Sequence, residues 1–321
     1  MFLTPEILTL FIADTLILLL VSIGFLVSIQ ILLKFDYTQD TPAQYALEKR
    51  AVLVSALVRS ALFFKIALFF FFLYTLDAVS GYIPGAMCAA GVVSADPTGI
   101  TLMVLKSLGL YLFSLWIVAD KEDLKSKNYR YTKLKSALFI AVFITITAEY
   151  AYEYLFFSSL EPSKVVSCCG AIFDPLKNSG FYSALLSISP WIAAAIFYAI
   201  FISMAISVLA RFYGLYALLN LIFLPVAVLT LILFFSPYIY ELPTHRCLFC
   251  FLQKEYAYAG YFIYMFLFLG TFFGFSYGFK KLLLKIEDRG DIKFSMLFNA
   301  LLVIILTAYP LVYYVKNGVW L

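Results

Sequence analysis

The residues most capable of chemistry lie in one short stretch, Tyr240–Gln253, with the sequence YELPTHRCLFCFLQ. It holds a Cys-x-x-Cys pair, Cys247 and Cys250, and the only histidine of the chain, His245. Thiolate and imidazole side chains bind soft metal ions, and a Cys-x-x-Cys pair can also cycle between dithiol and disulfide. Metal binding and redox exchange are therefore the two chemistries that this stretch favours.

Long apolar runs flank this stretch and recur along the chain. Of the 321 residues, 64% are hydrophobic and 13% are charged, which excludes a soluble globule. A helix of about 20 apolar residues crosses the hydrocarbon core, and continuous rather than alternating runs favour helices over a closed barrel. Short loops favour an up-and-down bundle. We predict an all-α polytopic membrane protein with a single transmembrane domain over residues 1–321. Its eight spans are expected at Ile7–Leu33, Val54–Val79, Ile100–Val118, Ser136–Phe157, Ala184–Leu209, Tyr216–Tyr238, Tyr261–Phe279 and Met296–Tyr314.

Basic residues indicate which side of the membrane each loop occupies. The loops after the third and seventh spans hold eleven of the 23 lysine and arginine residues, and such basic loops stay in the cytoplasm. We therefore expect both termini on the extracytoplasmic face, most simply in the inner membrane of a prokaryote. We attribute the net charge of +4 to this topology rather than to nucleic-acid binding.

The same topology places all five cysteines and the histidine on the extracytoplasmic face. Cys88 follows the second span, Cys168 and Cys169 follow the fourth, and the Cys-x-x-Cys pair follows the sixth. Cys88, Cys169 and Cys250 recur at equal intervals of 81 residues (88 to 169 and 169 to 250). This spacing suggests repeated two-helix hairpins that each carry a cysteine loop. The alternative is that successive hairpins simply have similar lengths.

Soft-metal binding is our leading interpretation of these loops. Adjacent cysteines do not readily form an unstrained disulfide with each other, which favours metal ligation by Cys168 and Cys169. Sulfur and imidazole ligands suit copper first and zinc second. The protein would then be an accessory or component of metal transport, with a metallochaperone as a candidate partner. The expected ligands are Cys88, Cys168, Cys169, His245, Cys247, Cys250 and Met87.

A membrane thiol–disulfide oxidoreductase is the alternative from the enzyme class. The Cys247-x-x-Cys250 pair at a span end, together with a loop cysteine, resembles membrane disulfide-forming enzymes of the DsbB and vitamin K epoxide reductase kind. The resemblance implies catalytic roles for Cys247 and Cys250, a quinone between the helices and a thioredoxin-like partner. Arg246 beside the pair would favour its thiolate.

Two further readings remain open. The order Cys88, Cys168-Cys169-Gly170 and Cys247-x-x-Cys250 is similar to the cysteine-rich CCG modules of heterodisulfide reductases, which implies an iron–sulfur cluster. Alternatively, the cysteines form structural disulfides in a non-catalytic subunit of a larger membrane complex. A single histidine excludes bis-histidine haem ligation by this chain alone. No phosphate-binding loop is present, so ATP-driven transport would need another subunit.

Ionisable residues inside the spans form a second group of candidates. Charges in hydrocarbon are costly and indicate either a structural pair or a functional path. We expect Lys106 to bond Asp77 or Glu149, either to fix helix packing or to form a proton or cation path. Five residues make up the predicted group: Asp14, Asp77, Lys106, Glu149 and Glu153.

Small residues and prolines predict local features of the spans. Gly270, Gly274 and Gly278 recur every fourth residue in the seventh span, a pattern that lets helices pack closely inside the bundle. Pro190, Pro225 and Pro310 are expected inside spans, where they should kink the helix. We therefore expect three bent spans.

Overall fold

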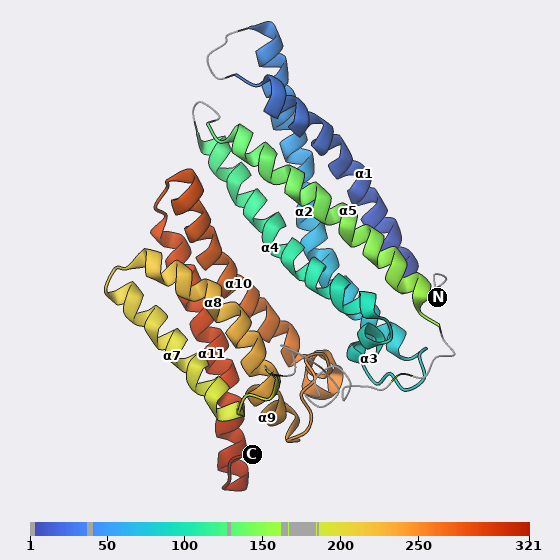
Figure 1. Ribbon diagram of the computed structural model, residues 1–321, viewed down its shortest axis with the longest axis vertical. Coiled ribbons are helices and arrows are strands. Elements are labelled where there is room, and N and C mark those ends of the chain that lie inside the picture. Colours follow the sequence, from blue (N-terminus) through green and yellow to red (C-terminus); the bar gives the residue numbers. More distant parts are fainter. Residues whose placement is uncertain (1–3, 37–40, 127–129, 162–165, 167–183, 185) are drawn as a thin grey trace. The chain divides into compact units, whose positions relative to one another are not determined.

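A computed structural model describes residues 4–36, 41–126, 130–161, 166, 184 and 186–321, and its regular elements are helices (Figure 1). Among the described residues, eight helices are long and apolar enough to cross a membrane, which confirms the predicted number of spans. The spanning helices are α1 (Pro5–Lys34), α2 (Pro42–Ser80), α4 (Pro97–Lys125), α5 (Thr132–Ser159), α7 (Pro190–Leu209), α8 (Tyr213–Thr230), α10 (Ala259–Phe279) and α11 (Arg289–Asn317). The short elements are α3 (Ala89–Ser94), η1 (Leu231–Phe235), α9 (Ser236–Tyr240), η2 (Cys250–Leu252), η3 (Lys254–Tyr256) and η4 (Lys280–Leu284).

Proline begins four of the spanning helices. Pro5, Pro42, Pro97 and Pro190 each stand at a helix start, where a missing N–H costs no hydrogen bond. The prediction that Pro190 lies inside a span was therefore wrong, and the fifth span begins at Pro190 rather than at Ala184. The other two prolines lie inside α8 and α11, as predicted.

Contacts between helices divide the chain into two compact units. Unit 1 comprises Met1–Pro84 and Val92–Val166, and unit 2 comprises Gly85–Gly91 and Ser167–Leu321. In unit 1, each spanning helix contacts the next one in the order α1, α2, α4 and α5, and α5 also contacts α1. In unit 2, α7, α8, α10 and α11 form the same kind of ring. Each unit is thus an up-and-down four-helix bundle (Figure 1). The orientation of the termini and the repeated hairpins stay predictions, as does the single transmembrane domain.

The core of unit 1 is built from large apolar side chains around one close helix contact. Gly24 on α1 faces Val58 and Phe139, and a Cβ at Gly24 would lie 2.6 Å and 2.8 Å from their side chains. Trp116 packs beside Phe139 with ring centroids 5.4 Å apart. Nearby, Lys135 is buried and pairs with Asp120 at 3.1 Å, although it lies just before the predicted fourth span, Ser136–Phe157.

In the middle of unit 2, neutral polar groups join the helices. Asn299 on α11 donates from Nδ2 to Oδ1 of Asn220 on α8 at 3.1 Å. Asn220 in turn donates to the carbonyl of Thr271 on α10 at 2.8 Å. A Cβ at Gly270 would meet the Asn299 amide, and one at Gly274 would meet the Asn220 amide. The predicted glycine stripe of α10 therefore packs inside this bundle.

Candidate functional site

Three of the five cysteines converge in unit 2. The Sγ atoms of Cys88, Cys247 and Cys250 all lie within 4.8 Å of one another. The exposed fractions of these residues are 0%, 0% and 6%. Among the described residues, no disulfide joins any two of them. We call these three residues the cysteine cluster.

The end of the sixth span sets the position of the Cys-x-x-Cys pair. The helix widens into a π turn at η1, and Pro237 follows, which lacks the N–H needed for a regular helical hydrogen bond. Glu241 then takes a left-handed conformation with φ of 52° and ends α9. The chain therefore turns sharply at Glu241 and brings residues 247 to 250 back over Tyr240.

Tyr240 fixes the backbone on both sides of the pair. Its hydroxyl donates to the carbonyl of Cys247 at 2.7 Å and accepts from the amide of Phe251 at 3.0 Å. Tyr264 on α10 donates to the carbonyl of Leu248 at 2.5 Å. Two tyrosine hydroxyls thus hold the loop through hydrogen bonds that do not involve a metal ion.

The Cys247 sulfur also receives a hydrogen bond from its own loop. The amide of Phe249 donates to Cys247 Sγ at 3.3 Å. This contact fixes the direction of the Cys247 side chain within its own loop.

Cys88 reaches the cluster from a different part of the sequence. The amide of Gly91 donates to the carbonyl of Cys88 at 3.0 Å, which closes the first turn of α3. A Cβ at Gly91 would lie 2.8 Å from Ala86, so only glycine fits this turn without displacement. Gln253 donates from Nε2 to the carbonyl of Met87 at 3.2 Å and so links the two loops. The Met87 side chain itself is 79% exposed.

His245 stands beside the cysteine cluster with one buried nitrogen. Its ring contacts the Tyr240 ring edge to face, with centroids 4.2 Å apart. Its Nε2 is buried and has no hydrogen-bond partner among the described residues. Burial lowers the pKa of His245, while the negative charge of Cys88 acts in the opposite direction. The imidazole is therefore neutral at neutral pH, which is the form that binds metals.

The remaining loop candidates divide into two groups. Cys168 and Cys169 lie outside the described residues, so their part in the site and in the predicted repeat stays a prediction. Arg246 directs its guanidinium to the carbonyl of Leu186 at 3.5 Å. That contact gives Arg246 a structural role in the loop beside any effect on the thiols.

Four of the five predicted charges inside the spans, Asp14, Lys106, Glu149 and Glu153, come together in unit 1. Lys106 pairs with Glu153 at 2.6 Å, with Asp14 at 3.4 Å and with Glu149 at 4.0 Å. The expected bond to Glu149 is present but is the longest of the three. Asp77 is half-buried near the end of α2, where its carbonyl accepts from the Ser80 hydroxyl at 2.6 Å.

A second lysine, Lys65 on α2, was missed in the sequence. It pairs with Asp14 and, at 3.0 Å, with Glu149. The signal was present, because Lys65 lies inside the same apolar run as the second predicted span. We call Asp14, Lys65, Lys106, Glu149 and Glu153 the charge cluster.

Fold and site together define an all-helical protein with eight helices of membrane-spanning length and a buried three-cysteine cluster. No family model, curated protein or solved structure matches the chain. Functional inference therefore starts from the chemistry of the two clusters.

Proposed function

We propose that this membrane protein binds one soft metal ion, copper(I) or zinc, through the thiolates of Cys88, Cys247 and Cys250. The observation that carries the proposal is the convergence of three buried sulfurs within 4.8 Å. Thiolate ligands select copper(I) and zinc over hard ions such as magnesium and calcium. Three buried thiolates without a cation would repel one another, and a metal ion would offset that repulsion.

The sulfur spacing supports a metal rather than a disulfide. A disulfide needs two sulfurs about 2.05 Å apart. A tetrahedral ion with metal–sulfur bonds of about 2.3 Å places its sulfur ligands about 3.8 Å apart. The Sγ atoms of Cys88 and Cys247 are separated by 3.8 Å. This pair already has the spacing that such an ion requires.

His245 is our candidate for the fourth ligand. Its Nε2 is buried and accepts no hydrogen bond from the described residues, although it is not part of the group of ligand atoms that lie within 4.8 Å of one another. Three cysteines and one histidine form one of the usual zinc ligand sets. Cys168 and Cys169 compete with His245 for this position, because they belong to the same predicted set.

The burial of the site indicates how the ion would be used. Closed sites with four protein ligands retain their metal, whereas catalytic sites keep an open position. We therefore favour an accessory role in metal handling, in which the loops must open to release the ion. On the topology predicted from the basic loops, the site would face the extracytoplasmic side and receive its ion from a metallochaperone.

Elemental analysis of detergent-purified protein tests this proposal directly. The protein is prepared without oxygen and measured beside the variants Cys88→Ser and Cys247→Ser/Cys250→Ser. We expect about one copper or zinc per chain in the natural protein and a loss of most of it in both variants. Lys254→Gln, an exposed change in the same loop, should keep the metal. Cys168→Ser/Cys169→Ser then decides whether His245 or a further cysteine completes the site.

The same preparation separates the metal site from the redox alternative. A protein without metal, whose thiols react only after a reductant is added, would overturn the proposal in favour of disulfides. Burial argues against thiol exchange with a partner protein, because reactive cysteines are usually partly exposed. Metal present in the natural protein and retained in both cysteine variants would also overturn it.

A further inference from the structure

The charge cluster in unit 1 contains more acids than bases. Asp14 comes from α1, Lys65 from α2, Lys106 from α4, and Glu149 and Glu153 from α5. None of the five residues is more than 5% exposed. Three carboxylates face two ammonium groups, so the cluster would carry one uncompensated negative charge if every group were ionised.

The depth of the cluster makes that surplus charge expensive. Asp14 and Lys106 each lie nine residues from the start of their helix, which corresponds to about 14 Å along the helix axis. The surroundings are apolar, and Phe72 covers Lys106 with its ring centroid 4.8 Å from Nζ. An isolated charge in such a place neutralises by taking up or losing a proton rather than remaining charged.

Two carboxylate oxygens in the cluster lack any donor. Oε1 of Glu149 and Oε1 of Glu153 are buried and accept no hydrogen bond from the described residues. Lys106 Nζ lies 3.4 Å from Asp14 and 2.6 Å from Glu153, so these two carboxyl groups crowd around one ammonium group. An ionised carboxylate is an acceptor only, and like charges held this close favour a proton on one of them.

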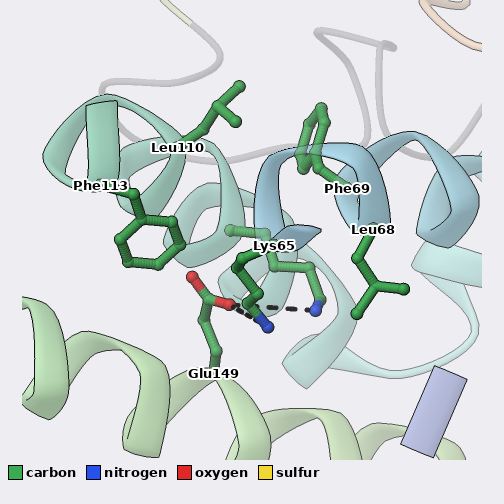
Figure 2. Close-up of a pocket in the computed structure, with 7 residues that line it drawn as sticks. Lys65, Leu68, Phe69, Leu110, Phe113 and Glu149 are labelled. Carbon is green, nitrogen blue, oxygen red and sulfur yellow. Dashed lines mark ion pairs between the residues drawn. The ribbon is translucent and has the colours of Figure 1, made fainter. Parts of the chain in front are cut away.

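Space is also present beside Glu149. A cavity of about 10 Å³ is lined by Glu149, Lys65 and Lys106 among others, and it approaches the volume that one water molecule needs (Figure 2). Figure 2 shows Glu149 reaching from α5 toward Lys65, and its dashed lines mark the ion pairs that Glu149 makes with the two lysines. Gly109 leaves room for the other oxygen, because a Cβ at this position would collide with Glu149 Oε1.

From the charge count, the donor-less oxygens and the cavity, we infer that the charge cluster binds one exchangeable proton inside unit 1. A carboxylate takes the proton from water, and no electrons move. The three carboxyl groups interact strongly, so the proton belongs to the cluster rather than to one residue. This proton site is independent of the proposed metal site, and Cys88→Ser should leave it unchanged.

Infrared spectroscopy of the protein in lipid bilayers tests the inference. The measurement follows the carbonyl stretch of protonated carboxyl groups as the pH is lowered from mildly alkaline to mildly acidic, in H2O and in D2O. We expect one deuterium-sensitive band that grows on acidification. Glu149→Gln, Glu153→Gln and Asp14→Asn should each abolish it, because each removes the surplus acid.

Lysine variants test the opposite change, because they increase the surplus of carboxylates. They also provide a readout if an acid variant fails to fold. Lys65→Gln leaves two surplus carboxylates and should about double the band, whereas Lys65→Arg keeps the charge and should leave it unchanged. A band that persists in all three acid variants, or one that never changes with pH, would overturn the inference. The absence of any band, as expected if a bound cation balanced the charge, would overturn it as well.

Discussion

The two units bury polar groups in opposite ways. Unit 1 gathers the five ionisable side chains of the charge cluster in the middle of its spanning helices, with ion pairs such as Lys106–Glu153 at 2.6 Å. Unit 2 uses amides and hydroxyls, for example the Tyr216 hydroxyl, which donates to Ser295 at 2.6 Å. The sequence from Tyr213 to Tyr240 and from Ala259 to Phe279 holds no Asp, Glu, Lys or Arg.

This difference helps to distinguish side chains that pack the helices from side chains that could have a chemical role. Neutral hydrogen bonds between membrane helices contribute about 0.6 kcal/mol on average and carry no desolvation cost of an ion. Unit 2 buries one ion pair, Lys280 with Asp291 at 3.0 Å, at the end of α10 and the start of α11. Between these ends its spanning helices pack without buried charge. Ions in the middle of the helices are therefore not required for a bundle as such, which supports a functional reason for keeping those of unit 1. Unit 2 places its own reactive groups in the loops instead.

The largest effect is expected from breaking the ion pairs of unit 1. Lys106→Met leaves three buried carboxylates facing one lysine, and removing one partner of a buried pair costs about 3–5 kcal/mol. Thermal unfolding in detergent should show a large loss of stability. The double variant Lys106→Met/Glu153→Gln restores the natural surplus of one carboxylate over the lysines and should recover much of the loss. Equal instability of the single and double variants would show that charge balance is not the cause.

A smaller effect is expected from crowding the neutral network of unit 2. Gly270→Ala places a methyl group against the Asn299 amide, and overpacking of this kind costs about 1–3 kcal/mol. Gly214→Ala is the matched control, because nothing lies within 4 Å of a Cβ at that position. Thermal unfolding of both variants makes the comparison. The interpretation is contradicted if the two variants are equally stable.

The smallest effect is expected in the pH dependence of metal retention. Burial lowers the pKa of His245, so the imidazole stays neutral below its usual pKa of about 6.5 and resists proton competition. As the pH falls, the natural protein should keep its metal until the ligands become protonated, and His245→Ala should lose it at a higher pH. Bound metal after dialysis at a series of pH values measures this. Superimposable curves would exclude His245 as a ligand.

Hydropathy predicted the spans well because length and apolar content alone decide them. The eight helices were correct in number, but their ends depended on local chemistry. Pro190 begins α7 because its missing N–H suits a first turn, and α2 starts twelve residues earlier than predicted, at Pro42 after the Thr41 cap. The π turn of η1 carries no sequence signal beyond the Pro237 that follows it.

The sequence pointed to candidate residues for each site, but it did not predict which of them contact one another. The distribution of basic residues predicted that the cysteine loops share one face, but only the fold brings Cys88 to Cys247 across 159 residues of sequence. Similarly, Glu149 and Glu153 share a helix face, but the rotation and depth of each helix decide which of them is closer to Lys106. Lys65 was missed because a single lysine barely lowers the mean hydropathy of a long apolar run.

The separation of Cys88 from its two partners also has a consequence in time. At about 5–20 residues per second, a ribosome needs roughly ten to thirty seconds to extend the chain from Cys88 to Cys247. Throughout that interval Cys88 exists without the other two cysteines of the cluster. The cluster therefore cannot assemble until Cys250 has been added to the chain, and loading of the proposed metal would have to wait at least until then.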